Sequence, residues 1–134
     1  MSEPASPNHP LRGSRVLIVE DQYLIADEMR RLVVELGGAV IGPAGEVATI
    51  LALIAAETPD LAVLDINLNG EQVWAVAYEL RDRGVPLIFA TGYDVSALRP
   101  PFEAAVHMEK PVSTRALAEA VERLGLASSR EVLS

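Results

Sequence analysis

The sequence contains no cysteine and few aromatic residues. Without cysteine, disulfides and thiolate metal sites are excluded, and a reducing compartment such as the cytoplasm is expected. Only 4% of the residues are aromatic although 50% are hydrophobic, so aliphatic side chains must fill the core. This composition favours a sheet covered by helices over an all-β sandwich.

Long apolar runs are also missing, and so is an excess of positive charge. No run approaches the ~20 apolar residues that span a bilayer, and the first residues lack the apolar region of a signal peptide. The net charge of −8 disfavours non-specific binding to nucleic acid or to an anionic membrane. We therefore expect neither of these as a partner, and we expect Mg²⁺ and other proteins instead.

Strand patterns alternate with helix patterns through the middle of the chain. Apolar runs predict strands at 16–19, 39–41, 61–65, 86–90 and 104–108. Amphipathic patterns predict helices at 22–36, from 47 to before Pro59, at 71–83 and from the N-cap Ser113 onward. We expect one domain over residues 15–126, with a disordered tail at 1–14 and a polar tail at 127–134.

This alternation predicts an α/β fold, a doubly wound five-stranded parallel sheet in the flavodoxin-like order 2-1-3-4-5. One stretch breaks the rhythm. Between Thr91 and the fifth strand, Pro100 and Pro101 permit at most a short turn of helix. We expect a loop there, with the fourth helix short or missing.

Residues able to do chemistry stand at the carboxyl ends of the predicted strands. Glu20 and Asp21 follow the first strand, Asp65 ends the third, Thr91 ends the fourth, and Lys110 lies just past the fifth. Ligands of doubly wound sheets bind at this edge. Each residue alone has an ordinary explanation, such as a helix cap or a solvated charge. Complementary groups at all four ends favour a functional site.

Carboxylates that cluster in this way repel one another unless a cation is present. Mg²⁺ prefers a few carboxylates, waters and a phosphate as its oxygen ligands. We expect Asp21 and Asp65 to be direct ligands and Glu20 to act through water, with the backbone carbonyl of Asn67 as a further ligand.

The remaining groups suit transfer of a phosphoryl group. Asp65 could attack phosphorus as a nucleophile, Lys110 could pair with one phosphoryl oxygen, and Thr91 could hydrogen-bond another.

The set Glu20-Asp21, Asp65, Thr91 and Lys110-Pro111 resembles the receiver domain of response regulators (CheY-like) over nearly the whole predicted domain. The resemblance implies phosphotransfer from a sensor histidine kinase to Asp65, Mg²⁺ dependence and slow self-catalysed hydrolysis. The chain would then be a phosphoacceptor and not a true enzyme. The resemblance also implies a cis peptide bond between Lys110 and Pro111.

Residues 89–93 read Phe-Ala-Thr-Gly-Tyr, which is similar to the signature of a subgroup of single-domain receivers. Members of this subgroup commonly work with kinases of the HWE or HisKA2 type. Receivers usually carry an aromatic switch residue where this chain has His107. Thr91 is expected to be a switch residue. Tyr93 either takes over the aromatic switching role or simply covers apolar surface, and for His107 we favour a partly buried, satisfied histidine.

We expect no output domain after the predicted receiver. The output would be contact with a downstream signalling protein, or the chain would drain phosphoryl groups from its kinase, and we expect a monomer. The alternative is a receiver-fold interaction module that is not phosphorylated, which the intact acidic cluster disfavours. A phosphatase of the haloacid dehalogenase type would need a second Asp where this chain has Asn67.

Overall fold

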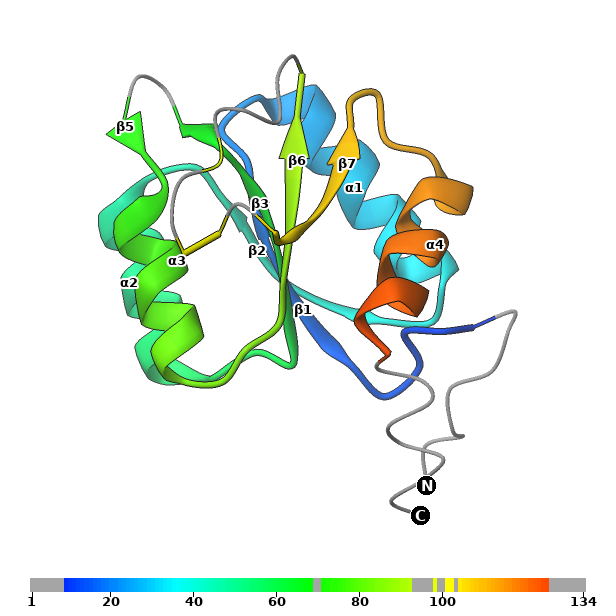
Figure 1. Cartoon of the computed structure of the whole chain (residues 1–134), viewed down its shortest axis with the longest axis horizontal. Coiled ribbons are helices and arrows are strands. Elements are labelled where there is room, and N and C mark those ends of the chain that lie inside the picture. The colour runs from blue at the N-terminus through cyan, green and yellow to red at the C-terminus, as the bar shows by residue number, and fades with distance from the viewer. Residues whose placement is uncertain (1–8, 69–70, 93–97, 99–100, 103, 126–134) are drawn as a thin grey trace.

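The computed structural model describes residues 9–68, 71–92, 98, 101–102 and 104–125. Its centre is a five-stranded sheet in the order β2-β1-β3-β6-β7, in which every neighbouring pair is parallel (Figure 1). The strands are β1 (Arg15–Val19), β2 (Ala39–Ala44), β3 (Leu61–Asp65), β6 (Leu87–Thr91) and β7 (Val106–Glu109). The 2-1-3-4-5 order expected from the sequence is confirmed.

Helices cover both faces of this sheet (Figure 1). Helices α2 (Val47–Ala56) and α3 (Trp74–Asp82) pack on one face, and α1 (Tyr23–Glu35) and α4 (Thr114–Leu124) pack on the other. Alternate β1 residues therefore enter different cores, Leu17 the first and Ile18 the second. Every residue of β3 and β6 is buried, which explains their continuous apolar character.

An aromatic cluster anchors the connection between β6 and β7. Of the residues described there (92, 98, 101–102 and 104–105), none lies in a helix, in agreement with the prediction. The Phe102 ring lies 5.7 Å from Trp74, 5.6 Å from Phe89 and 5.4 Å from Tyr78. These contacts bury apolar surface on the α3 side of the sheet and hold the connection against α3.

The start of α3 was predicted three residues too early. Strands β4 (Asn67–Leu68) and β5 (Glu71–Gln72) form a short antiparallel ladder directly after β3. The backbones of Glu71 and Gln72 are committed to this ladder, so the helix begins only at Trp74. The ladder has no helical or strand periodicity long enough to recognise in the sequence.

Strand β2 also runs further than predicted. It was predicted at 39–41, but the strand continues to Ala44, with a cis Gly42–Pro43 bond and a register shift against β1. Gly42 has a φ of +87°, a conformation that glycine adopts readily. The last helix begins as predicted, because the Ser113 hydroxyl accepts a hydrogen bond from the Ala116 N–H at 3.0 Å.

The predicted tail boundary at residue 14 is wrong, because part of that stretch is packed. Leu11 is fully buried in the core that α1 and α4 share with the sheet, and its N–H donates to the Leu36 carbonyl at 3.0 Å. Ser14 is buried as well. The folded part therefore includes residues 9–14. Within the described part of the chain, no helix has the length and apolar character that crossing a membrane requires.

Truncating Leu11 tests whether this N-terminal stretch belongs to the fold. Leu11→Ala should lower the free energy of unfolding by about 2–5 kcal/mol, because it removes a fully buried side chain and leaves a cavity. Leu24→Ala is the matched control, since Leu24 is 81% exposed and should change stability by less than about 0.5 kcal/mol. Urea denaturation measures both, and equal small effects would mean that residues 9–14 do not contribute to the core.

Candidate functional site

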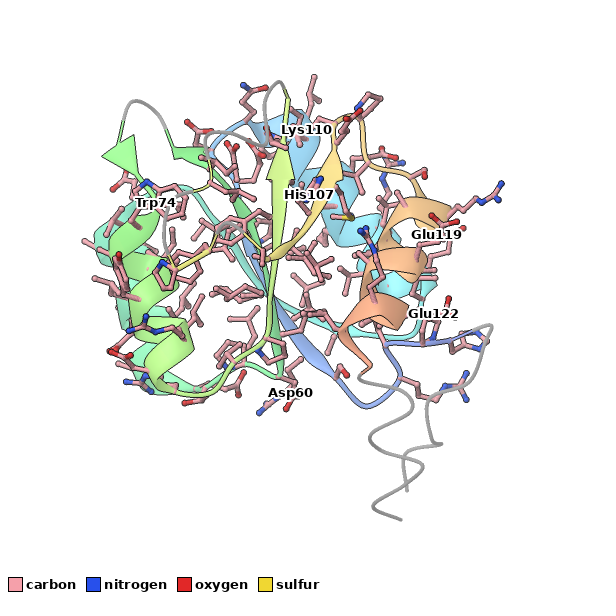
Figure 2. All side chains as sticks on the ribbon, viewed as in Figure 1. Asp60, Trp74, His107, Lys110, Glu119 and Glu122 are labelled. Atoms are coloured by element: carbon pink, nitrogen blue, oxygen red, sulfur yellow. The ribbon has the colours of Figure 1, made fainter. Side chains whose placement is uncertain are left out.

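The parallel sheet brings the predicted site residues to one edge. Glu20 and Asp21 follow β1, Asp65 ends β3, Thr91 ends β6, and Lys110 comes directly after β7. Figure 2 shows Lys110 at the arrowhead end of the strands and Asp60, which precedes β3, at the opposite end. Glu20, Asp65 and Thr91 are buried although they are polar, as expected for a built site and not for solvated surface charges.

Lys110 connects two of the carboxylates. Its Nζ lies 2.7 Å from Glu20 Oε2 and 3.4 Å from Asp65 Oδ1. The side chains of Lys110, Glu20 and Asp65 are 15%, 0% and 9% exposed, so the ion pairs are shielded from water. The Lys110 N–H donates to the Thr91 carbonyl at 2.9 Å, and the Lys110–Pro111 bond is cis, as the resemblance implied. The ends of β6 and β7 are therefore tied together at the site.

Three carboxylates crowd this edge. One oxygen each of Glu20, Asp21 and Asp65 can be chosen so that all lie within 4.8 Å of one another. Burial raises the pKa of the Glu20 carboxyl, and the charge of Asp65 acts in the same direction. Hydrogen bonds from Lys110 and from the Gln22 N–H, which lies 3.1 Å from Glu20 Oε1, lower it. Three carboxylates facing one ammonium leave an excess of negative charge.

The donor set fits a hard divalent cation. Carboxylate oxygens are the ligands that Mg²⁺ prefers, and their spacing allows one ion to reach all three. No thiol or imidazole belongs to the cluster, so its chemistry does not favour a softer metal. The residues therefore fit the cation that the sequence led us to expect.

The other predicted site residues are Asn67, His107 and Tyr93. Asn67 begins β4 two residues beyond Asp65, which puts its backbone beside the site. His107 lies in β7 opposite Phe89 and is half-buried, and its carbonyl accepts a hydrogen bond from Arg123 Nη2 at 3.2 Å. Tyr93 lies outside the described residues.

One neighbour of the site was missed in the sequence. Gly45, directly after β2, lies so close to Asp21 that a Cβ built on it would be 2.6 Å from Asp21 Cα. A glycine between a strand and a helix is common in any chain, so nothing in the sequence pattern singles this one out.

Comparisons with known proteins give a family and relatives for most of the chain. Residues 16–122 match the response regulator receiver domain family. The positive alginate biosynthesis regulatory protein of Pseudomonas aeruginosa is 39% identical over 115 residues, which is 81% of this chain and 46% of that protein. The chain thus spans about half the length of the curated relatives it matches.

Solved structures are similar over most of the chain. SdrG from Sphingomonas melonis has a TM-score of 0.75 at 33% identity, and the match covers 83% of this chain and 95% of that one. The PhyR stress response regulator has a TM-score of 0.73 at 30% identity, with 87% of this chain and 45% of that one covered.

The charge excess predicts a stability that depends on Mg²⁺. In metal-free buffer, Asp21→Asn should raise the free energy of unfolding by about 1 kcal/mol, the repulsion of two charges about 4 Å apart in a water-like medium. Mg²⁺ at 100 times its dissociation constant should stabilise the wild type by about 2.7 kcal/mol and the variant much less. Thermal unfolding with and without Mg²⁺ measures both effects.

Asp27→Asn is the control for this experiment. Asp27 lies on α1 and accepts hydrogen bonds from Arg30 at 2.9 and 3.1 Å, outside the cluster. This variant should keep the full Mg²⁺ response. A wild type whose unfolding temperature does not change with Mg²⁺ would contradict a cation site at this edge.

Proposed function

The chain belongs to the response regulator receiver domain family, and on that premise we propose that it accepts a phosphoryl group on Asp65 from a sensor histidine kinase. The observation that carries this proposal is the Lys110 ammonium, placed within 3.4 Å of Asp65 and 2.7 Å of Glu20. The chain is a phosphoacceptor and not a true enzyme.

Asp65 is the nucleophile of the transfer. One of its carboxylate oxygens attacks the phosphorus of the phosphohistidine, a P–O bond forms, and the P–N bond to the kinase imidazole breaks. The product is an acyl phosphate on Asp65, which water later hydrolyses. Asp65 is held for this reaction at the end of a fully buried strand.

Asp21 and Asp65 would hold Mg²⁺ directly, with Glu20 acting through water and the Asn67 carbonyl as a further ligand. The cation, when bound, neutralises charge on the phosphoryl oxygens. Three carboxylates on one side of the phosphoryl group would otherwise repel it.

Lys110 changes partners on phosphorylation. In the unphosphorylated protein its ammonium is shared by Glu20 and Asp65. The phosphoryl group brings about −1.5 to −2 charges and new acceptor oxygens, and Lys110 pairs with one of them. The Thr91 hydroxyl donates to another. Because the two backbones are hydrogen-bonded, both responses act on the ends of β6 and β7 together.

These strand ends flank the connection between β6 and β7 that Phe102 anchors. The surface of this connection is therefore the one that changes on phosphorylation. Tyr93 either takes over the aromatic role in this switch or covers apolar surface, and His107 is better explained as a partly buried, satisfied histidine. We further propose a kinase of the HWE or HisKA2 type, on the Phe-Ala-Thr-Gly-Tyr signature at 89–93. The chain works as a cytoplasmic monomer, without nucleic acid or membrane as a partner.

The output is contact with a downstream protein, or the chain is a phosphate sink for its kinase. A competition assay separates the two outputs, because a sink lowers the phosphorylation of a second regulator without binding any other target. The alternative function, an interaction module without phosphorylation, leaves the acidic cluster without a role.

Intact-mass measurement after incubation with acetyl phosphate tests the phosphoacceptor. The wild type should gain one phosphoryl group, only in the presence of Mg²⁺, and Asp65→Asn should gain none because it lacks the nucleophile. Asp60→Asn is the matched control at the other end of β3, where Asp60 Oδ2 accepts a hydrogen bond from the Arg15 N–H at 2.8 Å. It should be labelled like the wild type.

Equal labelling of Asp65→Asn and the wild type would contradict the assignment of the acceptor. If acetyl phosphate labels neither protein, transfer from a phosphorylated HWE-type kinase provides the same comparison. If the kinase does not label the wild type either, the result favours the interaction module that is not phosphorylated.

A further inference from the structure

The acidic pair, Glu20 and Asp21 after β1, lies directly against the backbone after β2. A Cβ added to Gly45 would lie 2.6 Å from Asp21 Cα, 2.8 Å from Asp21 Cβ and 3.2 Å from the Glu20 carbonyl oxygen. Real Cβ atoms essentially never approach other atoms below 3.0 Å. Gly45 is not among the glycines with positive φ, so space and not backbone conformation excludes a side chain here.

The two segments are also tied together by hydrogen bonding and register. The Glu20 N–H donates to the Ala44 carbonyl at 3.0 Å, and Val19 pairs with Ala44. The register of β2 against β1 shifts between Ile41 and Ala44, and Gly45 then lies against Asp21. The backbone at the end of β2 is therefore packed against the acidic pair and hydrogen-bonded to it.

We propose that Gly45 is a positioning residue for the cation and phosphoryl site, acting through Asp21. This inference rests on the proposed function. The missing side chain at Gly45 lets the Asp21 backbone approach β2 closely enough for its carboxylate to stand within 4.8 Å of those of Glu20 and Asp65. Gly45 touches neither the cation nor the phosphoryl group itself.

An alanine at position 45 would displace Asp21. Its Cβ must retreat from 2.6 Å to the 3.4 Å at which ordinary contact begins. Ala44 is paired in β2 and α2 starts at Val47, whereas Asp21 lies in a bend between β1 and α1. The bend yields more easily than the paired strand. Mg²⁺ demands near-ideal octahedral geometry, so a shift of this size weakens its site.

Gly38 offers a matched control at the other end of β2. A Cβ there would lie 2.9 Å from Val33 Cγ1 and 3.1 Å from Leu11 Cβ, both in the core at the opposite edge of the sheet. Gly38→Ala therefore crowds the residue before β2 against neighbouring side chains without touching the acidic pair. It should lower stability and leave the site unchanged.

Calorimetric titration of the full chain with Mg²⁺ tests the proposal. Gly45→Ala should weaken Mg²⁺ binding about 10- to 100-fold, the range found when residues that orient metal ligands are changed. Gly38→Ala should bind Mg²⁺ like the wild type. The rate of labelling by acetyl phosphate should fall in Gly45→Ala at limiting Mg²⁺ and recover at saturating Mg²⁺. A stabilising osmolyte in every sample keeps the crowded variants folded.

A double-mutant cycle shows whether Gly45 acts through Asp21. In the Asp21→Asn background, Gly45→Ala should cause little further loss of Mg²⁺ affinity. A loss as large as in the wild-type background would overturn the proposal. So would wild-type Mg²⁺ affinity in Gly45→Ala with a stability loss like that of Gly38→Ala.

The failure of the proposed function gives a different result. A wild-type chain that neither binds Mg²⁺ nor accepts a phosphoryl group would overturn that function, and this inference with it. A wild type that does both, beside a Gly45→Ala variant that behaves like Gly38→Ala, would overturn this inference alone.

Discussion

The repulsion among three carboxylates at one edge of the sheet is the constraint on which the site depends. Glu20, Asp21 and Asp65 stand within 4.8 Å of one another, and two of them are buried. Lys110 offsets part of this charge through its contacts with Glu20 and Asp65. The remaining excess favours a cation, and with the cation in place the same edge can accept an anionic phosphoryl group. One electrostatic imbalance thus accounts for both expected ligands.

The fold explains how such a cluster is held together. Parallel strands covered on both faces are buried and rigid, and their carboxyl ends meet at one edge. The site residues come from four segments that lie far apart in the sequence. The end of β2 supplies no charge, yet its register shifts against β1 and Gly45 lies directly against the backbone of the acidic pair. Repulsion would push that pair apart, so a close backbone support matters as much as the charges.

Much of this arrangement could be predicted from the sequence. The sheet order followed from the alternation of apolar runs and helical patterns, and the strand at 61–65 was predicted with its observed bounds. The residues of the cluster could be named because ligands in this fold meet strand ends. These features repeat along the chain or follow from the geometry of a parallel sheet, so local patterns reveal them.

The features that were missed depend on tertiary contacts. Leu11 stands among prolines and polar residues in a stretch typical of a tail, and only its contacts with the folded core show that it is buried. The ladder of β4 and β5 is too short to leave a pattern. The role of Gly45 is an approach between two backbones, which no composition or spacing encodes.

The most direct test of the central claim follows the backbone amide resonances of the site. Mg²⁺ and then beryllofluoride, a mimic of the phosphoryl group, are added to ¹⁵N-labelled protein. The account predicts Mg²⁺-dependent shifts at Asp21 and Asp65, and further shifts at Thr91 and Lys110 only after beryllofluoride is added. Shifts that are absent, or that centre on the opposite edge near Asp60, would contradict a cation and phosphoryl site at the carboxyl ends of the strands.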